Sequence, residues 1–276
     1  MKNIDLEELK RIEFNLLVQF DEIANENGFR YTIAGGTLLG AVRHKGFIPW
    51  DDDIDVSMPR PDYNKFIDYC KKEQTPFKLI CHETDNRYGY LFAKIADKRT
   101  VIEEENGNRE NADLGVYIDV FPIDGLGNSL KEAKEIFAKT SFKRELLVAA
   151  NWKRYFRSKR RPLYQEMIRF PMYLISRFMS YEKLIKSIEK IYLNIDFNEC
   201  KYVGCICGVY RLKDIFPQEV YSKYTKLEFE GRKFNAIADS DCYLSQFYGD
   251  YMKLPPIEKR KTHHTFKAYY KFQQTI

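Results

Sequence analysis

Carboxylates in two segments are the residues of this 276-residue chain best placed to do chemistry. The first segment is the run Asp51-Asp52-Asp53-Ile54-Asp55. If residues 53–58 form a strand, Asp53 and Asp55 project from one face, while Ile54 anchors the other face in the core. Two carboxylates held this close repel each other unless a cation lies between them. Because oxygen-only ligands favour Mg²⁺ or Mn²⁺, the spacing predicts a divalent metal site.

A third carboxylate is expected from a different strand if two metal ions are to be held. Asp119 lies between Ile118 and Val120 in an apolar run, where a charged residue is unusual without a functional partner. We therefore predict that Asp53, Asp55 and Asp119 are the catalytic and metal-binding residues. One of them, or a nearby base, would take a proton from the attacking hydroxyl.

A phosphate-binding turn is predicted shortly before the first carboxylates. Gly35 and Gly36 leave room for a phosphate to approach the backbone, and Thr37 then opens a helix with free N–H groups. Arg43 and His44 follow on the next loop and add positive charge. A phosphate cradle beside a metal pair is typical of phosphoryl transfer.

Each separate part of this pattern also has a simpler interpretation. A Gly-Gly pair is more often an ordinary turn, and an Asp run is usually a solvated acidic loop. A calcium loop of the EF-hand type is excluded, because its sixth and twelfth positions counted from Asp51 are Val56 and Asp62 rather than Gly and Glu. Asp124 precedes Gly125 in a turn and is interpreted as structural.

Two further residues are predicted to contact a substrate. Lys94 lies on an expected strand and suits the phosphate of a leaving nucleotide, although an ordinary surface lysine is an equally good interpretation. Trp50 directly precedes the Asp run, and an aromatic face at that place suits a quaternary ammonium group.

The elements that must position these residues follow from hydrophobic periodicity and turn residues. A helix is predicted over 6–27, with Asp5 and Glu8 at capping-box spacing. Strands are predicted at 30–34, 53–58, 77–81, 91–96 and 115–121. Later elements are a helical segment 129–194 broken at Pro162 and Pro171, a strand at 202–210, a hairpin turning at Glu230-Gly231 and a helix at 243–247. We predict one domain, 1–276, with an α+β core at 1–125 and a mostly helical part at 126–276.

Composition narrows the class of protein. Apolar residues make up 44% of the chain and the net charge is +5, which predicts a globular fold with a sizeable core. The polar N-terminus and the lack of a long apolar run predict a cytoplasmic protein, with its six cysteines as reduced thiols. Between residues 143 and 161, eight basic residues face one acid. This segment predicts peripheral contact with an anionic membrane, or else a solvated helix face; no nucleic acid is expected.

Four blocks of the sequence, 35–60, 92–97, 118–125 and 248–256, resemble the LicD family, which is related to the fukutin-related proteins. The resemblance implies a nucleotidyltransferase-like (polymerase-β-like) mixed sheet with flanking helices. The Gly-Gly-Ser/Thr turn and the paired carboxylates of that pattern match Gly35, Gly36, Thr37, Asp53 and Asp55, with Asp119 as the third acid.

The same resemblance implies an activity. Members of this group transfer a phosphorylated alcohol from its CDP-activated form to a sugar hydroxyl. The expectation is a Mg²⁺-dependent (or Mn²⁺-dependent) phosphotransferase that moves phosphocholine from CDP-choline to a cell-surface glycan, held on a lipid, and releases CMP. The alternatives are another CDP-alcohol (ribitol, glycerol or ethanolamine), a nucleotidyltransferase that releases pyrophosphate, and an inactive relative that only binds.

Overall fold

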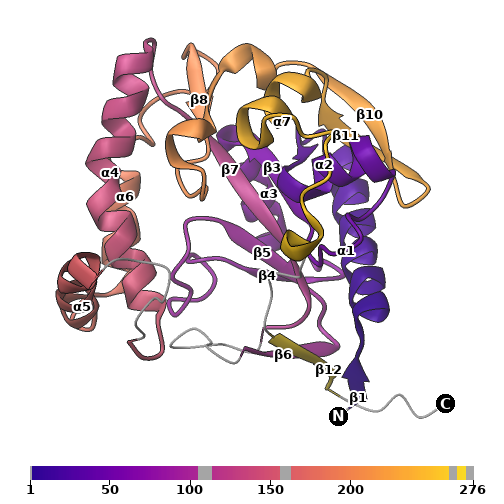
Figure 1. Cartoon of the computed structure of the whole chain (residues 1–276), viewed down its shortest axis with the longest axis horizontal. Helices are drawn as coiled ribbons and strands as arrows, with labels where there is room; N and C mark the ends of the chain where they lie inside the picture. Colours follow the sequence, from indigo (N-terminus) through magenta and orange to yellow (C-terminus); the bar gives the residue numbers. More distant parts are fainter. Residues whose placement is uncertain (1, 105–113, 156–162, 261–265, 272–276) are drawn as a thin grey trace.

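A mixed β-sheet lies at the centre of the protein (Figure 1). The computed structural model describes residues 2–104, 114–155, 163–260 and 266–271. The central strands, in spatial order, are β2 (Thr32–Ile33), β3 (Asp55–Pro59), β7 (Tyr117–Gly125), β5 (Ala93–Ala96) and β4 (Lys78–Ile80). Strands β3 and β7 run parallel, and the other neighbours in this row are antiparallel. The end of β7 also pairs with β8 (Tyr202–Gly204), which pairs with β9 (Ile215–Pro217).

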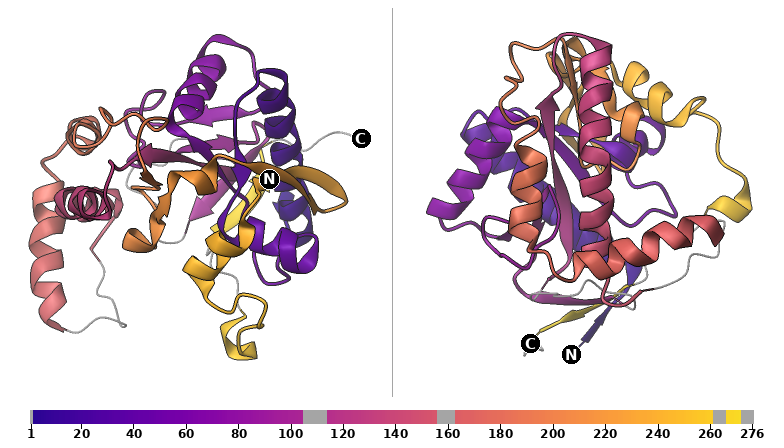
Figure 2. Two further views of the ribbon diagram at one scale, coloured as in Figure 1. Left: turned by 90° about the horizontal axis from the view of Figure 1, so that it is seen from above. Right: turned by 90° about the vertical axis from the view of Figure 1, so that its left-hand side faces the viewer.

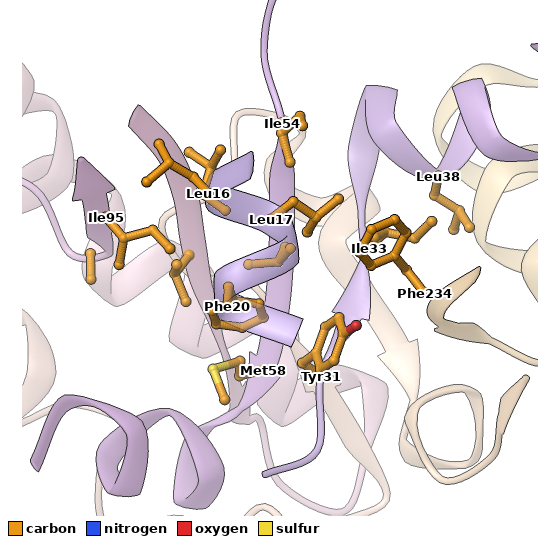
Figure 3. Packing of buried hydrophobic residues seen from close by; sticks show 14 of the residues in the cluster. Leu16, Leu17, Phe20, Tyr31, Ile33, Leu38, Ile54, Met58, Ile95 and Phe234 are labelled. Atoms are coloured by element: carbon orange, nitrogen blue, oxygen red, sulfur yellow. The ribbon is translucent and has the colours of Figure 1, made fainter. Parts of the chain in front are cut away.

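One face of the sheet is covered by the first helix. Helix α1 (Leu6–Glu26) begins at Asp5, whose carboxylate accepts a hydrogen bond of 2.9 Å from the backbone N–H of Glu8, as the capping spacing predicts. Leu16, Leu17 and Phe20 pack from this helix onto apolar side chains of the sheet (Figure 3). The remaining helices are α2 (Gly35–His44), α3 (Arg60–Lys72), α4 (Leu130–Asn151), α5 (Leu163–Ser176), α6 (Tyr181–Glu189) and α7 (Ser240–Tyr248).

Alternation along the central strands separates a core face from a second face. On β7, Ile118 and Val120 are fully buried, whereas Tyr117, Asp119 and Phe121 are partly exposed. Strand β3 alternates in the same way. Val56 is buried and is the register partner of Val120, and the residues next to Val56 in β3 point to the opposite face of the sheet. The polar side chains therefore gather on the face opposite the core.

The C-terminal half adds to two hydrophobic clusters. Helices α4 and α6 form the second cluster, with Leu126 and Ile206 among its buried residues. The hairpin of β10 (Tyr224–Phe229) and β11 (Arg232–Ile237) and helix α7 join the first cluster instead. This hairpin turns at Glu230 and Gly231, as predicted, and both residues have positive φ. The described residues thus form an α+β architecture, which confirms the predicted class.

Several features of secondary structure differ from the prediction. The strand predicted at 202–210 is shorter, because β8 ends at Gly204. Strand β3 begins at Asp55, so Asp53 lies in the segment before it. Pro171 does not break a helix; it lies within α5, which ends at Ser176. A separate sheet of β1 (Lys2–Ile4), β12 (Phe266–Tyr270) and β6 (Thr100–Glu104) was not expected. All three of its strands are short, and each depends on partners far away in the sequence.

All six cysteines are free thiols. Within the described ranges, none of the helices combines the length and the apolar character that crossing a membrane requires. Of the predicted basic segment, residues 143–155 are described and residues 156–161 lie outside the described residues.

Candidate active site

Parallel pairing of β3 and β7 brings two of the predicted carboxylates together. Asp55 is the register partner of Asp119, so their Cα atoms are neighbours across strands about 4.8 Å apart. Asp53 lies two residues before Asp55 and is partly exposed, like both of them. The backbone N–H of Asp119 donates to the carbonyl of Ile54 at 3.0 Å, which joins the two strands at the site. Asp55 and Asp119 therefore share one face of the sheet, and Asp53 lies in the segment that leads into β3.

The surroundings of Asp55 carry an excess of negative charge. Its pKa is raised well above the usual range, first by burial and then by the charges of Asp53, Asp119 and Asp51, while Lys94 acts in the opposite direction. Crowded carboxylates of this kind suit a divalent cation, whose charge would offset their repulsion. Among the described residues, no three His, Cys, Asp or Glu side chains already stand in the geometry of a metal site.

Helix α2 starts against these carboxylates. A Cβ on Gly35 would lie 2.7 Å from Asp55 Oδ2, and one on Gly36 would lie 2.6 Å from Asp51 Oδ2. Gly35 also has φ +52°, a conformation that side chains disfavour. The two glycines thus let carboxylate oxygens approach the positive end of the helix. Thr37 Oγ1 accepts a hydrogen bond of 2.8 Å from the backbone N–H of Asp55 and fixes the start of β3.

Arg43 and His44 lie at the C-terminal end of α2, where His44 is about 12 Å along the helix axis from Gly36. Trp50 lies beside His44, with the two ring centres 6.3 Å apart. Arg43 donates from Nε to His44 Nε2 at 2.9 Å and from Nη1 to the carbonyl of Tyr251 at 2.7 Å. Burial and the charge of Arg43 lower the pKa of His44, so its imidazole is neutral at pH 7. The His44 ring is edge-on to Trp50, and the Arg260 guanidinium lies 5.3 Å from the centre of the Trp50 ring.

Lys94 is directed at the carboxylates rather than at solvent. It is opposite Asp119 in the register of β5 and β7, and its Nζ lies 2.5 Å from Asp119 Oδ1. The same ammonium group lies 3.5 Å from the centre of the Tyr117 ring. The side chain is buried, which excludes an ordinary surface lysine. Lys94 therefore holds a positive charge inside the candidate site.

Aromatic rings continue from Lys94 across the same face. Ring centres of Phe92 and Tyr90 lie 5.2 and 5.9 Å from Lys94 Nζ. Phe92 packs against Phe121 with ring centroids 4.5 Å apart, and Tyr90 packs against Phe92 at 5.2 Å. All three rings are partly exposed. They form an aromatic wall, defined here as Tyr90, Phe92 and Phe121, beside the carboxylates.

The sequence interpretation missed Glu13. This acid lies on α1 beneath the site and is almost completely buried, and its Oε2 makes no hydrogen bond within the described part of the chain. Burial, followed by the charges of Asp53, Asp52 and Asp119, raises its pKa well above the usual range. A signal was present in the sequence, since Glu13 interrupts the apolar stripe between Leu9 and Leu17.

The predicted site residues thus fall into two groups. The first group surrounds the carboxylates and consists of Asp53, Asp55, Asp119, Gly35, Gly36, Thr37 and Lys94. The second group lies at the C-terminal end of α2 and consists of Arg43, His44 and Trp50.

Known proteins resemble the chain over most of its length. Residues 28–172 match a family model described as LicD/FKTN/FKRP, nucleotidyltransferase domain. The lipopolysaccharide cholinephosphotransferase LicD of Haemophilus influenzae is 33% identical over 273 residues, which cover 98% of this chain and 99% of that protein. A shorter match, 55% identical over 31 residues, covers 11% of this chain and 6% of the human ribitol 5-phosphate transferase FKRP.

The acidic face of the sheet and these matches define an enzyme of the phosphotransferase class. The chain belongs to the LicD family, as its motifs predicted.

Proposed function

We propose that this enzyme transfers phosphocholine from CDP-choline to a hydroxyl of a cell-surface glycan precursor and releases CMP. The observation that carries the proposal is the pairing of Asp55 with Asp119 on the polar face of the sheet, next to Asp53 and to the buried ammonium of Lys94. We also propose that the sheet with its helices is a nucleotidyltransferase-like fold, which the description of the matching family model supports.

The carboxylates fit Mg²⁺ or Mn²⁺. Asp53, Asp55 and Asp119 would hold it, because their oxygens are hard ligands. Burial first, and then the charges of Asp53, Asp119 and Asp51, raise the pKa of Asp55, and a bound cation would offset that repulsion. When bound, the cation would withdraw charge from the diphosphate of the donor.

The proposed reaction is a displacement at phosphorus, in which a carboxylate and Lys94 assist. The acceptor oxygen attacks the phosphorus that bears choline, the bond from this phosphorus to the CMP oxygen breaks, and CMP leaves. One of the carboxylates accepts the proton of the hydroxyl. Lys94 offers its ammonium to the charge that develops on the phosphate oxygens.

Choline is the proposed alcohol for two reasons. The aromatic wall offers partly exposed ring faces beside the carboxylates, and such faces attract a quaternary ammonium group. The relative that matches over nearly its full length is named a cholinephosphotransferase. Ribitol phosphate remains the alternative, because a shorter match is named a ribitol 5-phosphate transferase. Its hydroxyls would need hydrogen-bonding partners rather than rings.

Product analysis and two substitutions test this proposal. With CDP-choline, Mg²⁺ and lipopolysaccharide as acceptor, we expect CMP and choline-bearing acceptor as products; pyrophosphate would indicate a nucleotidyltransferase instead. Asp55→Asn and Asp53→Asn should lower turnover at least 100-fold with an unchanged circular dichroism spectrum, because the amide keeps the shape but loses the charge that the cation needs. EDTA should abolish turnover, and added Mg²⁺ or Mn²⁺ should restore it.

A matched control and a panel of donors make the test specific. Asp68→Asn neutralises an exposed acid on α3 and should leave turnover unchanged. A thermal-shift comparison of CDP-choline with CDP-ethanolamine, CDP-glycerol and CDP-ribitol identifies the donor, since a ligand that binds the folded state raises its stability. Near-normal turnover by Asp55→Asn or by Asp53→Asn in the presence of Mg²⁺ contradicts the metal-site proposal. Turnover of CDP-ribitol alone contradicts only the choline assignment.

A further inference from the structure

From residue 166 onward, helix α5 exposes most of its large apolar side chains, with Met172 as the buried exception, and buries most of Glu166, Arg169 and Ser176. An ordinary surface helix shows the reverse pattern. Its outward positions, and those of the turn that follows, carry large apolar residues that are between 46% and 92% exposed. We call these residues the outer face: Met167, Ile168, Phe170, Leu174, Ile175 and Phe178. Figure 2 shows α5 at the periphery of the molecule, beside α4 and away from the central sheet.

The polar side of α5 is tied to the protein. Glu166 and Arg169 are both about nine-tenths buried and form an ion pair of 2.6 Å. The hydroxyl of Tyr155 also donates to Glu166, and the guanidinium of Arg169 lies 4.6 Å from the centre of the Trp152 ring. Arg177 donates to the backbone carbonyl of Trp152. The ion pair lies within α5, but a rotation that buried the outer face would separate Glu166 from the hydroxyl of Tyr155 and Arg169 from the Trp152 ring. These contacts with the segment before α5 therefore hold the apolar side outward.

The charged residues at 153–154 and 177, on the segments that flank α5, are basic. Lys153 and Arg154 are exposed at the end of the connection from α4, and Arg177 is partly exposed after α5. Between residues 166 and 179, Glu166 is the only acid, and it is buried in its ion pair. A second copy of the chain on this face would bring like charges together. The outer face and its basic neighbours are instead complementary to a surface that carries negative charges next to an apolar interior.

We propose that the outer face of α5 inserts into the interfacial region of a membrane leaflet that contains anionic lipids. The apolar side chains enter the boundary between headgroups and acyl chains, while Lys153, Arg154 and Arg177 contact phosphate groups. Trp152, Tyr155 and Tyr173 form an aromatic cluster under α5, with rings 5.7 to 6.4 Å apart. Residue types of this kind favour the headgroup level. The proposal does not depend on which donor the enzyme uses.

Sedimentation with vesicles tests the proposal on the whole chain. Vesicles of phosphatidylcholine with 30% phosphatidylglycerol should bind the unsubstituted protein, and Ile168→Ser/Ile175→Ser/Phe178→Ser should lower the partition coefficient at least tenfold. The matched control is Val209→Ser/Leu212→Ser/Ile257→Ser, which removes three side chains that are between 53% and 83% exposed elsewhere. This control should bind like the unsubstituted protein. Because all six positions are exposed, both variants should fold.

Further measurements separate insertion from purely electrostatic adsorption and from dimer formation. With apolar insertion, at least half of the binding should persist in 0.5 M NaCl, and the fluorescence of a Phe178→Trp variant should shift to shorter wavelength on vesicles. Complete loss of binding in 0.5 M NaCl, or equal binding by the outer-face variant, overturns the proposal. The proposal is also overturned if the protein does not bind vesicles but forms dimers in analytical ultracentrifugation, and the outer-face substitutions dissociate these dimers. That result would identify a second copy of the chain as the partner of the outer face.

Discussion

At the residue scale, the candidate site combines the carboxylates of Asp55 and Asp119, which are register partners, with the ammonium group of Lys94, whose Nζ lies 2.5 Å from Asp119 Oδ1. Residue type predicted that Asp119 lies near Asp55, because a charged residue within an apolar strand is costly without a partner, and the register pairs these two residues. The surroundings of Trp50 could not be predicted, since the guanidinium over its ring belongs to Arg260, more than 200 positions away in the chain. Glu13 could have been predicted from its place in an apolar stripe, but its closeness to the acids depends on how α1 crosses β7.

The aromatic wall gives the first prediction at this scale. If the trimethylammonium group of choline lies on Phe92 and Phe121, replacing either with Leu removes one cation–π contact of about 0.5–2 kcal/mol. We expect the KM for CDP-choline to rise about twofold to thirtyfold, while the inhibition constant of CMP stays unchanged. Phe142→Leu, at an exposed position on α4, is the control. Trp50→Ala makes the competing test, and a larger rise in KM there would place choline at the other end of α2.

A second prediction concerns Asp214, whose buried carboxyl has an oxygen without a hydrogen-bond partner among the described residues. Burial raises its pKa to about 7, although the charge of Arg144 acts in the opposite direction. Because the pKa is higher in the folded state, the stabilisation is complete below about pH 4 and is lost as the pH rises through 7. Between pH 5 and pH 8, Asp214→Asn should gain about 2–3 kcal/mol relative to the unsubstituted protein.

Urea unfolding at both pH values measures this difference. Asp250→Asn, an exposed acid, serves as the control and should show no such gain. Parallel curves for Asp214→Asn and the unsubstituted protein would contradict the assignment of the pH dependence to Asp214.

At the scale of elements, a buried ion pair connects the start of α3 to the central strand. Arg60 donates to Asp124 at 2.5 and 3.1 Å, and the two side chains are 12% and 2% exposed. Burial alone would lower the pKa of Arg60, but the charge of Asp124 raises it overall. The interpretation of Asp124 as structural agrees with this pairing, but its predicted place in a turn is wrong, because β7 continues through Gly125. The partner was not predictable, because 64 positions separate the two residues in the chain.

Breaking this pair from either side should destabilise the protein. Asp124→Asn or Arg60→Met leaves one buried charge without its partner, so we expect a loss of about 3–5 kcal/mol in the free energy of unfolding. The double variant removes both charges and should lose less than the sum of the single variants. A double-mutant cycle from urea unfolding measures the coupling, and strictly additive effects would show that the pair contributes nothing.

At the scale of the whole molecule, the strands and helices that could be predicted are those whose own segments carry a periodic apolar pattern. The segments of β3, β5, β7 and α1 carry periodic apolar patterns, and all four elements were predicted. By contrast, β12 pairs with β1 at the other end of the chain and with β6 near residue 100. Such pairing leaves little trace in three short segments, since most of the stabilisation comes from partners that the sequence does not identify.

The last prediction tests whether this sheet holds both ends of the chain to the core. Ala268 is buried in β12 and pairs with Ile4 on one side and Ile102 on the other. Ala268→Asp would place a charge between two apolar neighbours, and we expect it to lower the free energy of unfolding by at least about 3 kcal/mol. Lys267→Asp changes the adjacent, exposed position of the same strand and should cost less than about 1 kcal/mol. Urea unfolding measures both values, and faster hydrogen exchange at residues 2–4 and 100–104 in Ala268→Asp would locate the damage. Equal stabilities for the two variants would mean that the small sheet opens without disturbing the core, because only a cooperative sheet transmits the cost of a buried charge to global unfolding.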